Sequence, residues 1–454
     1  MQALLHRILR KIVDVRAGEV GALLGSFAYF FCLLCGFYIL RPVRDEMAIT
    51  GGVKNLKWLF TGTFLVMFAA VPLYSAAVAR WPRRRFIPIV YRFFAANLLV
   101  FFAVFQLHAA EVHAARAFFI WVSVYNLFVV SVFWGFMADL WRSEQGKRLF
   151  GFIAAGGSVG ALVGPILVGQ LAGTLGVYNL LLLSAVMLEI AAQCARRLAR
   201  IGHTPADPSA PSDGSEPGAP GASTVPGATE GARKLGDERV GRGLWSGLRP
   251  VFRSPYLLAI SGQTLLTTLT ATVLYWQQMN VISAQIPDRA ARTALFANID
   301  LYTNLLSLAV QALVTGRVVR RMGILWALAA VPVVSAAGFI GLAWAPVIGV
   351  FVAFQVVRRA AHYGMERPGR EMLFTVVRPE EKYTSKSFID TVVYRGGDAA
   401  SIWATEATAP VLGAAGLSLG MLPFIGAWLA LNVFLARRQA ERARERAEAA
   451  PGLP

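Results

Sequence analysis

Long uncharged runs recur along this chain, and each is about the length of a helix that crosses a hydrocarbon core of roughly 30 Å. Six such segments precede a polar break and six follow it. The pattern therefore predicts an all-α polytopic membrane protein with twelve transmembrane helices in two six-helix halves. The predicted segments are 20–41, 56–79, 86–107, 117–140, 149–172 and 177–195, then 255–282, 294–316, 324–344, 346–365, 386–411 and 413–436.

The polar break has a composition that cannot bury a core. Residues 203–231 are almost entirely Pro, Gly, Ser, Ala, Thr and acidic residues, which predicts disorder. Residues 1–18 alternate basic and aliphatic positions, as an amphipathic surface helix does, and they lack the features of a cleaved signal peptide. The predicted parts are an amphipathic N-terminal segment 1–18, a first bundle 19–200, a disordered linker 201–250, a second bundle 251–437 and a charged tail 438–454.

Basic residues are concentrated in the loops that follow even-numbered segments, which all lie on the same side of the membrane. Arginines and lysines flank the linker, follow the last segment, and fill the loops after the second, fourth and eighth segments. By the positive-inside rule these loops, the linker and both termini face the cytoplasm, and we expect a multi-pass protein of a bacterial inner membrane. Twelve helices with a cytoplasmic central linker are typical of the major facilitator architecture.

The composition excludes several classes of function. Apolar residues make up 56% of the 454 positions and charged residues only 15%, which no soluble domain of this size requires. The net charge of +18 is explained by basic cytoplasmic loops, so we expect no nucleic-acid partner. The chain has no Walker lysine, H-E-x-x-H, G-x-S-x-G or metal-binding cysteine cluster. We therefore expect a non-enzyme without cofactor or metal, acting as a monomer in the lipid bilayer.

A glycine stripe marks the fifth predicted segment. Gly156, Gly160 and Gly164 recur at every fourth residue. Small residues at this spacing let membrane helices approach closely. We therefore predict helix packing along this face and no phosphate-binding loop.

Ionisable residues at membrane depth are the main functional signal. Charged side chains there are costly and face protein, water or substrate rather than lipid. Arg41, Arg44, Asp45 and Glu46 follow the first apolar segment directly, and further charges interrupt the last third of the chain. Anchoring at headgroups explains Arg41 and Arg44 about as well as substrate binding does. Structural ion pairing is the corresponding alternative for a second group, which consists of Asp390, Arg395 and Asp398.

At these residues the chain resembles the ATP/ADP translocase family of plastids and intracellular bacteria. Five segments that are typical of this family have counterparts here. In the family they read Tyr-x-Ile-Leu-Arg-Asp-x-Lys-Asp, Phe-Trp-Gly-Phe, Thr-Glu-Glu-Ala-Lys-Arg, Pro-Thr-Lys-Glu-Met and Lys-Ala-Ala-Ile-Asp. The counterparts are Tyr38-Ile39-Leu40-Arg41-Pro42-Val43-Arg44-Asp45, Phe133-Trp134-Gly135-Phe136, Ser143-Glu144-Gln145-Gly146-Lys147-Arg148, Pro368-Gly369-Arg370-Glu371-Met372 and Lys386-Ser387-Phe388-Ile389-Asp390. The resemblance covers most of both halves. Arg44 and Arg370 replace family lysines, Pro42 replaces an aspartate, and Gln145 replaces a glutamate.

This resemblance implies a carrier that exchanges nucleotides across a membrane. Arg44, Glu144, Arg370 and Lys386 stand at family charge positions. We expect a secondary transporter, an exchanger of nucleotides or related phosphorylated anions, that works by alternating access about a site lined in part by helices 1, 4, 7 and 10. The predicted substrate-binding residues are Arg41, Arg44, Arg370 and Lys386, and the predicted charge partners or gates are Asp45, Glu144, Asp390, Arg395 and Asp398.

Two other functions remain open from the sequence. One is a proton-coupled carrier of another organic solute, in which His362, Glu366, Asp300 or Asp390 couples transport to protons. The other is a membrane scaffold or sensor that has the carrier fold without transport.

Overall fold

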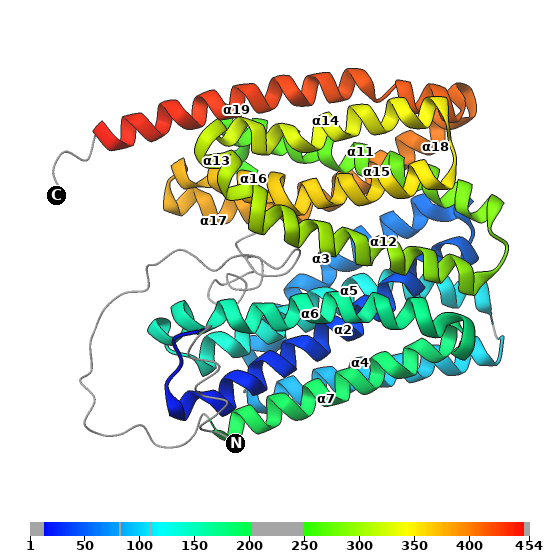
Figure 1. Ribbon diagram of the computed structural model, residues 1–454, viewed down its shortest axis with the longest axis vertical. Helices are drawn as coiled ribbons and strands as arrows, with labels where there is room; N and C mark the ends of the chain where they lie inside the picture. The colour runs from blue at the N-terminus through cyan, green and yellow to red at the C-terminus, as the bar shows by residue number, and fades with distance from the viewer. Residues whose placement is uncertain (1–12, 81–82, 109, 202–247, 449–454) are drawn as a thin grey trace. The chain divides into compact units, whose positions relative to one another are not determined.

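The computed structural model describes residues 13–80, 83–108, 110–201 and 248–448. All regular elements in these ranges are helical, as predicted (Figure 1). The predictions for the disordered linker, for most of the N-terminal segment and for the last residues of the tail lie outside the described residues. The part of the tail that is described continues the last helix to Glu448.

Each of the first six predicted segments lies mainly on one long helix, and the sixth begins in a short 3₁₀ turn before its helix. The first helix differs most from its predicted bounds, because it continues through Arg41–Glu46 to Thr50 with Pro42 inside it. The charged residues are therefore part of the helix and do not follow it. The helices are α2 (Val20–Thr50), α3 (Leu56–Arg80), α4 (Arg83–Gln106), α5 (Glu111–Leu140), α6 (Ser143–Leu175) and α7 (Leu180–Ile201), with 3₁₀ turns η1 (Ala17–Glu19), η2 (Val53–Asn55) and η3 (Val177–Asn179).

The second group of segments is also helical, but several of its helices are interrupted. Three five-residue π-helical turns and a kink at Gly413, which has φ 66°, break the regular geometry. The elements are α10 (Leu248–Arg253), α11 (Pro255–Gln285), α12 (Arg289–Val310), η4 (Gln311–Thr315), α13 (Gly316–Met322), α14 (Ile324–Trp344), α15 (Ile348–Ala361), η5 (His362–Glu366), α16 (Arg367–Leu373), η6 (Phe374–Val376), α17 (Pro379–Phe388), η7 (Ile389–Val393), α18 (Tyr394–Leu419) and α19 (Leu422–Glu448).

Nine helices of the described chain are long and apolar enough to cross a membrane. A bent pair, Thr384–Leu419 with Leu422–Arg446, raises the count to ten. The chain is thus a multi-span helical membrane protein, and this count falls short of the predicted twelve. The predicted tenth segment lies on α15, which is only 14 residues long, carries Arg358 and Arg359, and continues into the charged η5 and α16.

The described chain divides into two compact units. Among the described residues, unit 1 consists of those up to Asp45, those from Leu73 to Ile201, and Thr293–Ala297. Unit 2 consists of Glu46–Pro72, the residues from Leu248 to Arg292, and those from Asn298 onward. The predicted bundle boundaries at 19–200 and 251–437 remain a prediction.

Unit 1 is built around a close contact between α2 and α6. A Cβ atom on Gly156 or Gly160 would lie 2.5 Å from the carbonyl oxygen of Phe27 or Phe31, and one on Gly164 would lie 2.8 Å from that of Cys35. The predicted glycine stripe is thus confirmed as a packing face. Aromatic rings also pack against α2, where Phe30 stacks on Phe133 of α5 with centroids 4.2 Å apart.

In unit 2, α11 packs against α18, and α14 packs against α15, α18 and α19 (α14 and α19 are adjacent in Figure 1). Its apolar core divides into a cluster around Tyr256, Leu373 and Phe374 and another around Leu274, Phe339 and Phe354. Between the residues of these clusters along α11 lie Thr264, Thr267 and Thr268, which are buried and polar. The helix therefore offers a polar middle between two apolar ends.

Candidate substrate site

The predicted cations of unit 1 lie on the C-terminal part of α2. Arg44 pairs with its neighbour Asp45 at 2.6 Å, and its guanidinium lies 5.3 Å from the centre of the Phe119 ring. The Arg41 guanidinium lies 5.7 Å from the centre of the Tyr38 ring. Arg44 and Asp45 expose 21% and 12% of their side chains. The Arg44 and Asp45 side chains are therefore mostly buried within the unit.

The two predicted cations of unit 2 are each paired with a carboxylate. Arg370 Nη2 donates to Asp390 Oδ1 at 2.7 Å, and Lys386 Nζ donates to Glu371 Oε2 at 2.5 Å. The cations are the more buried partners, with 16% and 8% of their side chains exposed against 34% for Asp390 and 25% for Glu371. In a buried site a cation without such a partner would be strongly destabilising.

The three charges of the predicted group Asp390, Arg395 and Asp398 do not all pair with one another. Arg395 and Asp398, one helical turn apart on α18, approach to 3.7 Å. Asp390 instead pairs with Arg370 of α16. The sequence indicated pairing within this helix, but only the tertiary packing brings the partner of Asp390 from a separate helix.

A second polar network lies beside Arg370 and was only partly predicted. His362 Nδ1 and Glu366 Oε2 are 2.7 Å apart, and Thr267 donates its hydroxyl to Glu366 at 2.9 Å. Arg358, almost fully buried, donates to the Thr267 carbonyl oxygen at 3.0 Å. Arg370 also reaches the hydroxyl of Thr264 at 3.4 Å, so the polar middle of α11 adjoins the charged residues of α15 to α16.

Two of the π-helical turns lie in this region. His362 and Glu366 are the first and last residues of η5, and Asp390 lies in η7. A π-turn inserts an extra residue in a helical turn and often marks a functional site. The carbonyl oxygens of η5 are partly satisfied by side chains of η4, since Gln311 donates to Tyr363 and Thr315 donates to Gly364.

A further buried pair was missed at the sequence level. Arg292 at the start of α12 binds Glu46 of α2 through two hydrogen bonds of 2.6 and 2.7 Å, and the Glu46 side chain is fully buried. Both residues belong to unit 2. Arg292 precedes an apolar segment and was not a candidate, whereas Glu46 belonged to the charged group at the end of the first predicted segment.

Glu144 lies apart from these clusters. It pairs with Lys147 at 2.8 Å with 82% of its side chain exposed. Its neighbours in the same motif instead hold the start of α2, since Gln145 and Arg148 both donate to Glu19. Although partial burial opposes ionisation, these bonds and the Arg16 amide hold the pKa of Glu19 below its ordinary value.

Chemically, the unit 2 cluster contains two cation–carboxylate pairs. Guanidinium and ammonium groups bind phosphate oxygens as they bind carboxylates. In the described part of the chain, no group of three or more His, Cys, Asp or Glu residues is arranged to hold a metal ion. The geometry suits reversible anion binding.

The family model of the Major Facilitator Superfamily matches residues 21–367 of this sequence. The chain belongs to the major facilitator superfamily. Among curated proteins it is similar to ADP,ATP carrier protein 1 of Chlamydia trachomatis serovar D. The two are 21% identical over 511 aligned residues, which cover 95% of this chain and 92% of the relative.

Solved structures of other transporters share the fold of this major facilitator protein. A bacterial homologue of the iron transporter ferroportin, inward-facing, gives a TM-score of 0.62 at 12% identity, covering 92% of this chain and 99% of that one. A bacterial homologue of the human lysosomal transporter Spinster, inward-facing and unoccupied, gives 0.56 at 13% identity, covering 96% and 100%. The nucleoside transporter NupG, solved in a mutant form, gives 0.55 at 13% identity, covering 93% and 99%.

Proposed function

We propose that this chain is a secondary transporter that exchanges nucleotides or related phosphorylated anions by alternating access. The observation that carries the proposal is the pairing of Arg370 with Asp390 and of Lys386 with Glu371. Two cations are kept at the site in a form that an anion can compete for. The similarity to a carrier named for ADP and ATP, over most of both chains, supports the same substrate class.

The pairs give a physical basis for reversible binding. A vacant site that held two unpaired cations would be costly in a low-dielectric interior, so each carboxylate stabilises the vacant state. A phosphate group that displaces the carboxylates gains charge-assisted hydrogen bonds to both cations. Because one set of contacts replaces another, net affinity stays modest, which a carrier needs in order to release its cargo.

The location and state of the protein form part of the proposal. The loop arginines support a bacterial inner membrane with both termini in the cytoplasm. Arg41, Arg44, Arg370 and Lys386 are proposed as substrate contacts, with Asp45, Glu144, Asp390, Arg395 and Asp398 as partners or gates. A monomer that works without a nucleic-acid partner completes the proposal.

A proton-coupled carrier of another organic solute is the second candidate, and one observation favours it. His362 and Glu366 are 2.7 Å apart, the Glu366 side chain is buried, and both residues lie in a π-turn beside Arg370. Paired ionisable groups at membrane depth are found in proton relays. Uptake that follows an imposed pH gradient, is lost in His362→Gln and is insensitive to nucleotides would favour this candidate.

Exchange in proteoliposomes tests the first candidate. Full-length protein is reconstituted into vesicles loaded with ATP, ADP or another nucleotide, and uptake of labelled nucleotide is measured against empty vesicles. We expect exchange that Lys386→Gln lowers at least about tenfold, since a charged hydrogen bond contributes roughly 1.5–3 kcal/mol. Arg320→Gln, on the exposed face of α13, is the matched control. Folded protein without exchange of any tested nucleotide or phosphorylated anion contradicts the proposal.

A further inference from the structure

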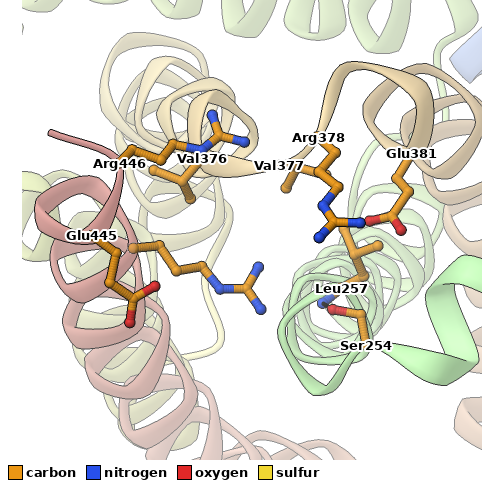
Figure 2. Close-up of a pocket in the computed structure, with 9 residues that line it drawn as sticks. Ser254, Leu257, Val376, Val377, Arg378, Glu381, Glu445 and Arg446 are labelled. Carbon is orange, nitrogen blue, oxygen red and sulfur yellow. Dashed lines mark hydrogen bonds between the residues drawn. The ribbon is translucent and has the colours of Figure 1, made fainter. Parts of the chain in front are cut away.

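A pocket of about 380 Å³ lies in unit 2, apart from the ion pairs of the candidate site. Figure 2 shows side chains from three places in the chain around it: Ser254 before α11, Arg378 and Glu381 at the start of α17, and Glu445 and Arg446 near the end of α19. Arg442 completes its charged lining. A second pocket of about 330 Å³ shares Arg442 and Glu445 and extends to Tyr256 and Phe434. Because the two pockets share these two lining residues, they adjoin, and we call them together the recess.

The recess lies at the level where these helices leave the apolar region. Ser254 immediately precedes the candidate span that begins at Pro255, and Arg378 and Glu381 precede the one that begins at Thr384. On α19 the apolar sequence ends at Ala436, and the charged lining residues follow within about ten residues, or roughly 15 Å of helix. Arg442, six residues past Ala436, lies roughly 9 Å beyond the apolar sequence, at or just outside the lipid headgroups, which add several ångströms to each side of the hydrocarbon core.

Two arginines of the recess, Arg442 and Arg446, are held in place by groups that do not neutralise them. The Arg442 guanidinium lies 4.5 Å from the centre of the Tyr256 ring, and Arg446 donates to the Thr375 carbonyl oxygen at 2.8 Å. Arg438, in contrast, pairs with Glu441 at 2.9 Å. Against three lining arginines stand two lining glutamates, so the main pocket keeps an excess of positive charge.

Apolar surface continues from the recess along the helices. Leu258 and Phe434 are 47% and 38% exposed, and Phe252, just before α11, is 68% exposed. Such side chains suit contact with acyl chains, while the guanidinium groups suit a phosphate. A ligand with a phosphate at one end and hydrocarbon at the other matches both surfaces.

We propose that this recess binds the phosphate headgroup of an anionic membrane lipid, with Arg442 and Arg446 as its main contacts. Basic pockets between membrane helices at the cytoplasmic surface recognise anionic headgroups in this way. The bound lipid joins the ends of α11, α17 and α19, and so stabilises unit 2. A free phosphate offers the same oxygens without the hydrocarbon, and the experiment separates the two sources.

Full-length protein is purified in detergent, and its thermal stability is followed during titration with phosphatidylglycerol, phosphatidylcholine or inorganic phosphate. A ligand that binds only the folded state raises the melting temperature. We expect phosphatidylglycerol to raise it and the other two to have little effect. The double variant Arg442→Gln/Arg446→Gln should weaken the apparent affinity for phosphatidylglycerol at least about tenfold.

Matched variants keep the test decisive. Arg437→Gln/Arg444→Gln removes the same charge from the same helix but from residues that do not line the recess, and it should change the affinity less than about twofold. Glu445→Gln removes a lining carboxylate and should tighten binding. Equal weakening by both double variants, equal stabilisation by phosphatidylcholine or inorganic phosphate, or weaker binding by Glu445→Gln would overturn the proposal.

Discussion

At the scale of single residues, the charges within the membrane helices are held by defined partners. In four ion pairs the nitrogen of the cation lies within 2.7 Å of a carboxylate oxygen. These pairs are Arg44 with Asp45, Arg370 with Asp390, Lys386 with Glu371, and Arg292 with Glu46. The cations of the first three pairs were predicted substrate contacts, whereas Arg292 of the fourth pair was not predicted. The fourth is the most buried, and it joins α2 to α12 within unit 2.

Breaking the Glu46–Arg292 pair should be strongly destabilising. Arg292→Gln leaves the Glu46 carboxylate buried without its partner, and we expect a loss of about 3–5 kcal/mol in unfolding free energy. The double variant Glu46→Gln/Arg292→Gln removes both charges and should recover much of this loss. Chemical unfolding in detergent measures both. A single variant as stable as the native protein would contradict the assignment of a buried pair.

At the scale of helices, packing was partly readable from the sequence. The spacing of Gly156, Gly160 and Gly164 predicted a close-packed face, and α2 occupies it. Phe133 and Trp134, noted only as part of a family segment, prove to pack on Phe30 of α2. The segment thus has a structural role in unit 1, whatever else it does.

A glycine comparison on α6 tests this packing face. A Cβ atom on Gly160 would meet the Phe31 carbonyl oxygen at 2.5 Å, whereas one on Gly173 would meet nothing within 4 Å. Gly160→Ala should destabilise the protein by about 1–3 kcal/mol through overpacking. Gly173→Ala should be neutral or stabilising by up to about 1 kcal/mol, because alanine favours helix. In thermal unfolding we expect Gly160→Ala to lower the melting temperature and Gly173→Ala to leave it unchanged or raise it. Equal losses of stability at both positions would contradict the packing role of the glycine stripe.

The contact of η1 with α6 should make stability depend on pH through Glu19. Its pKa is lowered in the folded state from an ordinary value of 4.5, so its contribution is present above that pH and is lost as the pH falls through the folded pKa. The stability difference between native protein and Glu19→Gln should be constant at neutral pH and shrink in acid. Asp14→Asn, with an exposed side chain, is the control. A pH-independent difference would refute the role of ionised Glu19.

What the sequence could not reveal was which elements bring charges together. Asp390 and Arg395 lie close in sequence, yet Asp390 pairs with Arg370, twenty residues away on another helix. The π-turns η5 and η7 also have no recognisable sequence signature, and they alter which side chains share a face. The hydrophobic pattern was sufficient to predict where helices form. The partner of each charged residue depended on tertiary packing, which the pattern does not contain.

At the scale of the whole molecule, hydrophobic patterning predicted a polytopic helical protein and the matched family agrees. The division of the described chain into units places Glu46–Pro72 with the later helices, a grouping that sequence order alone does not indicate. The candidate residues are accordingly distributed, with Arg41, Arg44 and Glu144 in unit 1 and Arg370 and Lys386 in unit 2.

If both units contribute to transport, one substitution in each should impair it. We expect Arg44→Gln and Arg370→Gln each to lower nucleotide exchange at least about tenfold, because each removes a charged contact that we propose for the phosphate. Arg196→Gln, paired with Glu189 on a partly exposed surface, is the control for unit 1. Initial rates at several nucleotide concentrations distinguish weaker binding from slower turnover. Native rates in either variant would remove that residue from the substrate contacts.

The carboxylate partners of Arg370 and Lys386 have an electrical consequence. Each pair is neutral as a unit, so a vacant carrier moves no net charge of these four residues through the membrane potential, where one elementary charge corresponds to about 2.3 kcal/mol per 100 mV. The voltage sensitivity of exchange should then arise from the cargo. Swapping two solutes of unequal valence would be electrogenic, and swapping two of equal valence would be electrically silent.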